Sequence, residues 1–322
     1  MRISVIVPTR DRPDDLHRAL VAIAAQNHSD FEVIVVDDGS NSTSRKRHQE
    51  FAVEFGSRFN FIYLGVAGQR GAGPSPARNI GIENATGQLI VFCDDDDFWC
   101  TPNYLVSVSD SFDSQPTLDM YIGNQKAVHV DGRVQPDWLP ALCSAAKSRQ
   151  PFNDGVVLVS HQDLCAAGGF PQLNTVVVRR EVVERIGGFW NTLTYEGDRD
   201  FFWRALDQYR AIAFNPTVVA QHHVPDPAKT VNQSTSHKAV ERWLISALIS
   251  DHITASARNT DIVKLAVSYK GDLLRKVCLK LVEQKAMKPA FLMGRQALAA
   301  RFSIKWAVYV LWLLIKQRRS PT

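Results

Sequence analysis

The feature that most constrains the fold is a series of short, almost wholly apolar runs in the N-terminal third of the chain. These runs lie at residues 3–7, 31–36, 59–64 and 88–93. Apolar residues recur at helical spacing between them, at residues 14–26 and 77–83. Strands that are apolar on both faces and alternate with helices are typical of a parallel sheet covered on both sides. The sequence therefore predicts an α/β fold.

Polar residues directly follow three of the predicted strands. Thr9, Arg10 and Asp11 follow the first strand, Asp37 and Asp38 end the second, and residues 94–97 follow the fourth. The carboxyl ends of parallel strands lie at one edge of the sheet, which is where ligands bind in such folds. We therefore expect these polar groups to converge on one site.

Residues 94–97 are four consecutive aspartates. Adjacent carboxylates repel one another, so a buried run of them needs a cation. Oxygen ligands suit Mg²⁺ or Mn²⁺, and Mg²⁺ often bridges to substrate phosphates. The alternative is a solvated acidic turn, but apolar residues flank the run on both sides.

Beyond Phe98 the pattern is less regular. We expect strands at 120–123, 127–130 and 174–178, a short helix at 179–186, and a strand within 211–220. Residues 131–170 are expected to be rich in loops, and residues 238–316 to be almost entirely helical. The expected domains are an α/β domain over residues 1–225 and a basic helical extension over 226–322.

Four segments occur in order along the chain: VIVPTRDRP at 5–13, EVIVVDDGS at 32–40, ARNIG at 77–81 and FCDDDDFW at 92–99. Together they resemble the family 2 glycosyltransferases, which have the GT-A fold, over about residues 2–225. Segments 175–180, 186–189 and 196–200 also fit. The resemblance implies transfer of a sugar, with inversion, from a nucleoside-diphosphate sugar.

The resemblance also implies roles for individual residues. Pro8 and Thr9, with Arg10 beside them, contact the nucleotide. Asp38 binds the base or ribose next to Asp37, and Arg78 lies near the base or diphosphate. Asp94 and Asp95 face the ribose and sugar, whereas Asp96 ligates Mn²⁺ or Mg²⁺. A divalent metal stabilises the charge that develops on a departing diphosphate.

The acceptor hydroxyl must lose a proton, which calls for a carboxylate base. Asp198 matches the central acidic position of the family's glutamate–aspartate motif, although Gly197 stands where the glutamate is usual. Glu196 and Asp200 are the alternatives for the base, and a helix N-terminal charge is the alternative role for Asp198.

Two further segments have open interpretations. The resemblance implies that a histidine after the last predicted strand helps to hold metal or diphosphate, which is either His222, taken here as the metal ligand, or neighbouring His223. The alternative is a pair of surface histidines at the end of a strand. Residues 68–73 are rich in glycine but lack the lysine and hydroxyl residue of a P-loop. Because no helix is predicted directly after them, we interpret them as a flexible loop over the nucleotide.

Charge is distributed unevenly. Residues 226–322 hold 17 Lys and Arg against 6 Asp and Glu, whereas residues 1–225 hold 20 against 27. Residues 306–315 are apolar and include Trp306, Tyr309 and Trp312. As a helix they span about 15 Å, too short to cross a bilayer. They suit either an interfacial helix on an anionic membrane or a helix packed on the catalytic domain. No module for nucleic acid accompanies the charge, so we expect no such partner.

The five cysteines show no metal-ligand spacing and are odd in number, which favours free thiols in the cytoplasm. The apolar start at residues 3–7 is too short for a signal peptide.

The predicted activity is transfer of a sugar, from a UDP-linked donor, to a polysaccharide or lipid-linked acceptor. The alternatives are a nucleotidyltransferase and a non-catalytic protein that binds nucleotide-sugars.

Overall fold

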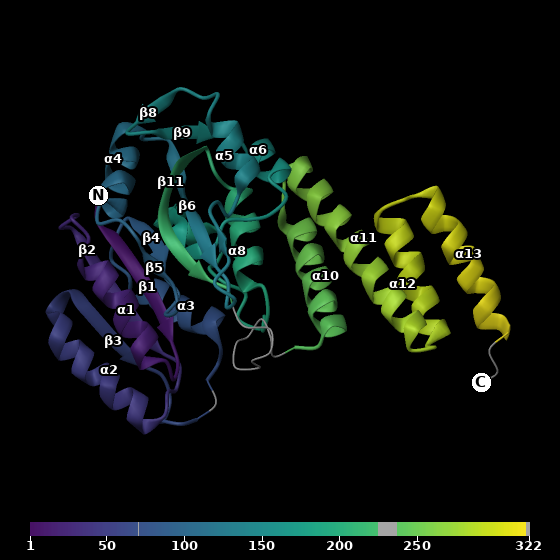
Figure 1. Ribbon diagram of the computed structural model, residues 1–322, viewed down its shortest axis with the longest axis horizontal. Helices are drawn as coiled ribbons and strands as arrows, with labels where there is room; N and C mark the ends of the chain where they lie inside the picture. Colours follow the sequence, from purple (N-terminus) through teal and green to yellow (C-terminus); the bar gives the residue numbers. More distant parts are fainter. Residues whose placement is uncertain (70, 225–236, 320–322) are drawn as a thin grey trace. The chain divides into compact units, whose positions relative to one another are not determined.

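The computed structural model describes residues 1–69, 71–224 and 237–319. Contacts within the chain divide it into two compact units, Met1–Asp226 and Pro227–Thr322. Figure 1 shows strands and helices in the first unit and, where the second unit is described, only helices.

The first unit is built on one mixed sheet. Its strands are β1 (Ile3–Thr9), β2 (Phe31–Asp37), β3 (Phe59–Tyr63), β4 (Leu89–Phe92), β5 (Phe98–Trp99), β6 (Leu118–Val128), β7 (Val134–Gln135), β8 (Pro151–Asn153), β9 (Val156–Val159), β10 (Val176–Arg179) and β11 (Ala211–His223). They lie in the order β3-β2-β1-β4-β10-β6-β11-β9-β8, with β5 on β11 and β7 on β6. The first four strands are parallel, and β10 is antiparallel to both β4 and β6. The predicted α/β fold is confirmed.

Helices cover both faces of this sheet. They are α1 (Pro13–Ala24), α2 (Ser42–Phe55), α3 (Pro74–Asn84), α4 (Tyr104–Ser114), α5 (Pro140–Ala146), α6 (His161–Ala166), α7 (Arg180–Arg185) and α8 (Gly197–Leu206). Val5 of β1 shares a buried cluster with Leu16 and Leu20 of α1. On the opposite face, α3 lies so close that a Cβ at Gly81 would be 2.3 Å from Cγ2 of Ile6. Burial on both faces explains why most residues of β1 are apolar.

The middle of the chain is more regular than its sequence indicates. The two strands predicted at 120–123 and 127–130 are one strand, β6. Asn124 and Gln125 between them are polar but buried, and Asn124 donates to Asp137 and to the Pro216 carbonyl oxygen. Residues 131–170, predicted to be rich in loops, also contain the short elements α5, α6 and β7 to β9. These elements are short, so they carry little periodicity.

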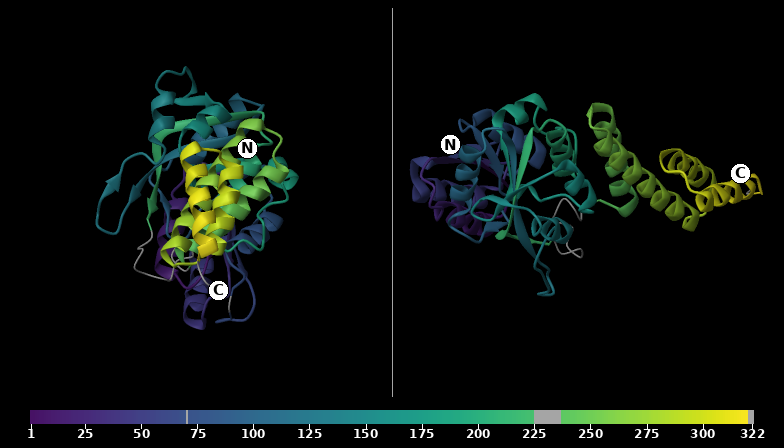
Figure 2. Two further views of the ribbon diagram at one scale, coloured as in Figure 1. Left: turned by 90° about the vertical axis from the view of Figure 1, so that its right-hand side faces the viewer. Right: turned by 90° about the horizontal axis from the view of Figure 1, so that it is seen from above.

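The second unit contains α10 (Ala239–Ser256), α11 (Thr260–Glu283), α12 (Met287–Ala300) and α13 (Ile304–Arg319). Each of these helices packs against the next (Figure 2). The predicted helical extension is therefore confirmed. Among the described residues, no helix combines the length and the apolar character needed to cross a bilayer.

Candidate active site

The ends of β1, β2 and β4 come together as expected. Thr9, the last residue of β1, is in register with Asp37, the last residue of β2. Asp95 follows β4, and its Oδ2 accepts a 2.8 Å hydrogen bond from Oγ1 of Thr9. Pro8 is buried in β1, whereas Arg10 is exposed and donates to the Gln69 carbonyl oxygen at 3.2 Å. The polar groups that follow the strands thus form one site.

Asp37 lies at the base of this site and is fully buried. Its carboxylate accepts the backbone N–H of Ser40 at 2.7 Å and lies 2.9 Å from Nδ1 of His48. Burial alone would raise the pKa of Asp37, but the hydrogen bonds from His48 and Ser40 outweigh it and lower the pKa. These contacts make Asp37 an organiser of the turn after β2, and its contact with a nucleotide stays a prediction.

Asp38 holds the glycine-rich segment predicted to lie over the nucleotide. Its carboxylate accepts the backbone N–H groups of Ala72 and Gly73 at 2.8 and 2.7 Å. A Cβ at Gly71 would lie 2.2 Å from Oδ2 of Asp38, so only glycine allows this approach. A carboxylate has about four acceptor positions, which leaves capacity for a ligand donor. The prediction that no helix follows this segment was wrong, because Gly73 is the N-cap residue of α3.

Arg78 connects α3 to the acidic run. Its Nη2 lies 2.5 Å from Oδ1 of Asp94, and its guanidinium lies 5.4 Å from the ring centroid of Phe189. The Arg78 side chain is buried, whereas 39% of the Asp94 side chain is exposed. Arg78 can therefore fix the direction of Asp94 while Asp94 remains open to a ligand.

Arg12 is a site residue that the sequence did not indicate. Its Nη1 lies 2.8 Å from Oδ2 of Asp96 and 3.2 Å from Oδ1 of Asp95. Burial and the charge of Asp96 raise the pKa of Asp95 to about 7. Burial, Asp97 and Asp94 raise the pKa of Asp96 to about 6. Arg12 opposes both shifts but does not cancel them, so these carboxylates suit a further cation.

Asp97, which the sequence analysis gave no separate role, holds His222. The Asp97 carboxylate lies 3.0 Å from Nδ1 of His222 and accepts from the His223 backbone N–H and from Asn174 Nδ2. Burial alone would lower the pKa of His222, but the hydrogen bond and charge of Asp97 outweigh it and raise the pKa. A carboxylate on one ring nitrogen is the usual way to orient a metal-binding histidine.

The structure distinguishes the two neighbouring histidines. Both belong to the end of β11 rather than to a segment after it. Nδ1 of His223 lies 2.6 Å from the Asp96 carbonyl oxygen, and its Nε2 lies 3.0 Å from Nε2 of Gln221. Both ring nitrogens of His223 thus have protein partners. In His222, Asp97 holds Nδ1, which orients the ring so that Nε2 can bind a metal. The geometry therefore favours Nε2 of His222 as the metal ligand.

Nowhere in the described chain do three or more His, Cys, Asp or Glu side chains form a complete metal cage. Mg²⁺ in phosphate-binding sites commonly takes one or two carboxylates and completes its shell with water and substrate phosphates. Asp96 and His222 fit such an incomplete ligand set. The raised pKa of Asp96 and the carboxylate behind His222 both suit a cation at this place.

Asp198 lies in the first turn of α8 and is half-buried. The pKa of Asp198 is raised, chiefly by burial. The charge of Arg78 opposes this shift, and the charge of Glu196 adds to it. The influence of Arg78 links Asp198 to Asp94, because Arg78 is paired with Asp94. A carboxylate with a raised pKa next to the donor site has the properties of a general base.

The two alternatives to Asp198 are engaged elsewhere. Asp200 is fully buried and accepts two hydrogen bonds from Arg204, at 2.6 and 2.8 Å. Glu196 has a left-handed backbone, with φ of 52°, and its carboxylate is 3.1 Å from Nε of Arg199. Asp200 is therefore a packing residue, and Asp198 is the better candidate for the base.

Gly197 has a structural reason to replace a larger residue. A Cβ at this position would lie 2.5 Å from Oγ of Ser75 in α3. The close contact between α8 and α3 brings Asp198 toward Arg78, on the same helix as Ser75. Glycine in place of the usual glutamate at position 197 therefore allows α8 to pack closely against α3.

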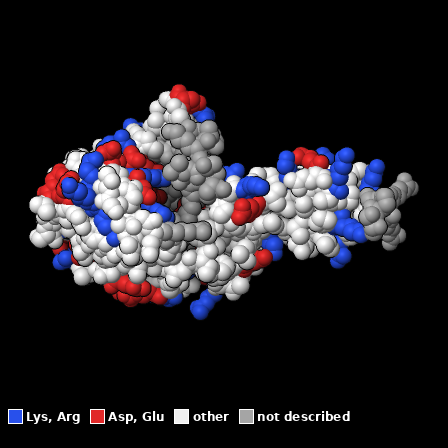
Figure 3. Space-filling model, turned by 90° about the horizontal axis from the view of Figure 1, so that it is seen from below, with Lys and Arg blue, Asp and Glu red and all other residues white. Residues whose placement is uncertain are grey.

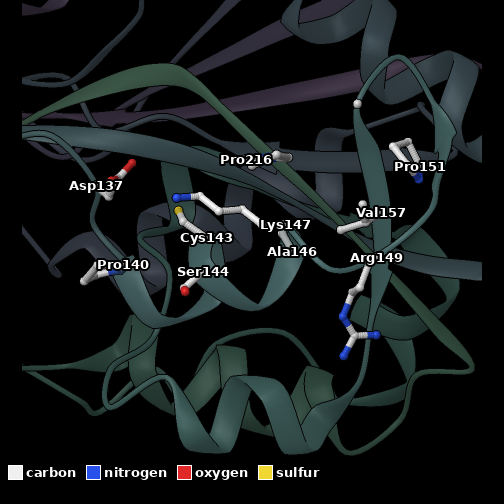
Figure 4. A pocket seen from close by; sticks show the side chains of 11 residues that line it. Asp137, Pro140, Cys143, Ser144, Ala146, Lys147, Arg149, Pro151, Val157 and Pro216 are labelled. Atoms are coloured by element: carbon white, nitrogen blue, oxygen red, sulfur yellow. The ribbon is translucent and has the colours of Figure 1, made fainter.

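A separate groove of about 580 Å³ lies beside α5 and β9 (Figure 4). Its lining includes Asp137, Lys147 and Arg149 but none of the predicted donor-site residues. Figure 4 shows Lys147 and Cys143 near each other on one side and Arg149 on the other. This groove is therefore not the predicted donor site.

Comparison with known proteins relates the first half of the chain to a family. Residues 4–133 match the profile of glycosyl transferase family 2. An uncharacterised glycosyltransferase of Nostoc sp. is 30% identical over 192 residues, which cover 58% of this chain and 53% of that protein. The chain therefore spans about half the length of this relative.

Two solved structures have a similar fold. Residues 1–349 of TarS from S. aureus, in complex with UDP-GlcNAc, give a TM-score of 0.68 at 18% identity, and the match covers 93% of this chain and 81% of that fragment. The mannosyltransferase PcManGT from Pyrobaculum calidifontis, in complex with GDP-Man and Mn²⁺, gives 0.54 at 19% identity over 99% and 81% of the two chains. At this identity they establish the fold, which is GT-A as the sequence predicted.

Proposed function

Because this chain belongs to the family 2 glycosyltransferases, we propose that it transfers a sugar, with inversion, from a UDP-linked donor to a glycan or lipid-linked acceptor in cell-surface glycan synthesis. The observation that carries the proposal is that Asp38 and residues 94–97 follow the parallel strands β2 and β4, while Arg78 pairs with Asp94 and lies close enough to Asp198 to affect its pKa. Ligands of open α/β sheets bind beyond the carboxyl ends of such strands.

The donor subsite is formed by the first half of the domain. Pro8, Thr9 and Arg10 end β1, and Asp38 supports the segment that would lie over the base. The complexes of TarS with UDP-GlcNAc and of PcManGT with GDP-Man support a nucleoside-diphosphate sugar at the equivalent place. UDP is our choice of nucleotide, since TarS gives the higher similarity score.

Asp96 and Nε2 of His222 would hold Mn²⁺ or Mg²⁺. The ion would supply positive charge to the departing diphosphate. Asp97 orients His222 for this role, and Thr9 and Arg12 hold Asp95 and Asp96 in place. The Mn²⁺ complex of PcManGT supports a divalent ion in this fold.

Asp198 would act on the acceptor. Its carboxylate takes the proton of the acceptor hydroxyl as the hydroxyl oxygen bonds to the anomeric carbon, and the bond from that carbon to the diphosphate oxygen breaks. One displacement of this kind inverts the configuration. The raised pKa of Asp198 makes it a stronger proton acceptor than an ordinary aspartate.

The alternatives are less well supported. A nucleotidyltransferase is expected to carry a glycine-rich segment directly after its first strand, whereas residues 8–13 contain no glycine. A non-catalytic binding protein would not need a base, yet Asp198 lies beside the Arg78–Asp94 pair.

The proposed place of action is the cytoplasmic face of a membrane, because the basic C-terminal residues suit an anionic surface.

Binding of the donor tests the proposal. UDP, GDP and their common sugar conjugates are titrated by calorimetry with and without Mn²⁺. We expect one conjugate to bind in a metal-dependent way, and Asp96→Asn to lose this binding. Asp131→Asn is the matched control, because Asp131 is exposed in a turn outside the site. If no nucleotide-sugar binds in the presence of metal, the proposal is wrong.

A further inference from the structure

We propose that α13 docks this protein in the plane of an anionic membrane surface through one apolar face, formed by Ile304, Val308, Leu311 and Ile315. This inference rests on the membrane location in the proposed function and adds the element, the face and the chemistry of contact. We call these four residues the docking face.

The docking face is a continuous stripe. Its residues are spaced by four, three and four positions, which places them on one side of an α-helix. Their exposed fractions are 75%, 62%, 60% and 54%. Phe302, just before the helix, is 73% exposed. Scattered single apolar residues are ordinary on a surface, but a contiguous apolar stripe indicates a contact.

The opposite side of α13 is packed and fixes the helix in place. Val310 and Leu313 are buried, and Leu313 shares a cluster with Cys278 of α11 and Ala290 of α12. Nε1 of Trp306 donates to the Gly294 carbonyl oxygen at 3.0 Å. One side of α13 thus packs on other helices of the second unit, whereas the docking face is exposed.

The charge around the docking face suits anionic lipid. Residues 284–322 contain 8 Lys and Arg and no Asp or Glu. Lys305 and Lys316 are exposed, and Nζ of Lys316 lies 5.7 Å from the ring centroid of Trp312, which is 40% exposed. Figure 3 shows Lys and Arg side chains distributed over the second unit among uncharged surface. Apolar residues flanked by lysines and an aromatic ring are typical of helices that lie in the membrane interface.

A second copy of the chain is a poorer occupant. Symmetric pairing through α13 would bring two cationic segments that lack acidic residues against each other, and like charges repel. Anionic headgroups instead neutralise these cations, at about 1 kcal/mol for each Lys or Arg near the surface. The charge therefore selects lipid over self-association.

Vesicle sedimentation of the full chain tests the proposal. The probes are phosphatidylcholine vesicles with and without phosphatidylglycerol, at low and high salt. We expect binding to the anionic vesicles that weakens with salt. Val308→Glu should weaken it about tenfold or more, because it places a carboxylate within the docking face. Val53→Glu is the matched control: Val53 is 84% exposed on α2 in the other unit.

A second pair of variants tests the charge. Lys305→Gln with Lys316→Gln should weaken vesicle binding, whereas Lys46→Gln on α2 should not. The proposal is wrong if the wild type does not sediment with anionic vesicles or if Val308→Glu binds like the wild type. It is also wrong if Val308→Glu changes the oligomeric state or the melting temperature without changing vesicle binding, since protein would then cover the face.

Donor binding without vesicles, measured on the same variants, separates this proposal from the proposed function. Val308→Glu should bind the nucleotide-sugar like the wild type. Loss of vesicle binding with normal donor binding supports the docking face. Normal vesicle binding with no donor binding in the wild type would contradict the proposed function alone.

Discussion

Nη1 of Arg12 lies 2.8 Å from Oδ2 of Asp96, and the same nitrogen lies 3.2 Å from Asp95. The protein thus supplies a cation of its own to the two carboxylates at the centre of the acidic run. The guanidinium contributes charge where the proposed metal would also contribute it. Arg12 should therefore matter most when no metal is bound.

Replacing Arg12 tests this dependence. Arg12→Gln should destabilise the metal-free protein by about 1–3 kcal/mol, because it leaves partly buried carboxylates without their partner. For a domain of this size that is a fall in melting temperature of a few degrees. Mn²⁺ should raise the melting temperature of the variant more than that of the wild type.

Arg18→Ala is the control for Arg12→Gln. Arg18 also pairs with an aspartate, Asp15, but 62% of its side chain is exposed, and exposed pairs contribute little. Equal melting temperatures for the wild type and Arg12→Gln without metal would contradict the role given to Arg12.

The pH dependence of turnover reports on Asp198. Burial raises the pKa of this carboxyl group. The base must be ionised, so kcat/KM should rise with pH through the raised pKa of Asp198 and fall as pH is lowered through it. Measuring donor binding over the same pH range separates this effect from protonation of Asp96. A kcat/KM that is independent of pH from about 4 to 8, or that falls as pH rises across this range, would exclude Asp198 as the base.

The two histidines at the end of β11 should differ in their effect on metal binding. His222→Ala should weaken Mn²⁺-dependent donor binding by about tenfold or more, because it removes the proposed ligand that Asp97 orients. His223→Ala should have a smaller effect, since the ring of His223 contacts the Asp96 backbone and Gln221. Calorimetry with Mn²⁺ measures both. The reverse order would show that His223 is the ligand.

The contact between α8 and α3 predicts a suppressor. Gly197→Ala should destabilise the protein by about 1–3 kcal/mol, because its Cβ would lie 2.5 Å from Oγ of Ser75. Ser75→Ala removes that oxygen, and the remaining distance to the Ser75 Cβ is 3.8 Å, an ordinary contact. Denaturant unfolding of the single and double variants should therefore show that Ser75→Ala relieves much of the cost of Gly197→Ala. Additive effects of the two changes would contradict the close contact.

The parallel half of the sheet could be predicted from the sequence for a physical reason. Strands such as β1 and β4 are buried on both faces, so nearly every residue in them is apolar and the run is visible without knowledge of its neighbours. The convergence of Thr9 and Asp95 followed from the common direction of these strands. β6 was misjudged because its buried Asn124 is satisfied by Asp137 and Pro216, which local sequence cannot show.

The finer geometry of the site depends on contacts between distant residues. Arg12 and Asp96 are 84 positions apart, and Asp97 and His222 are 125 apart. Neither pair leaves a local pattern. The departure at Gly197 was visible in the sequence, but its reason, the proximity of Ser75, appears only when α3 and α8 pack. The role of Asp200 likewise became clear only from its contact with Arg204.

The most direct test of the account is release of nucleoside diphosphate from the donor that binds, measured with Mn²⁺ and an acceptor extract for the wild type, Asp96→Ala and Asp198→Asn. We predict metal-dependent release by the wild type, loss of both binding and release in Asp96→Ala, and loss of release by about 10²-fold or more with intact donor binding in Asp198→Asn. Release by Asp198→Asn at the wild-type rate would contradict the assignment of the base. Release by the wild type that is independent of metal would contradict the role of the acidic run.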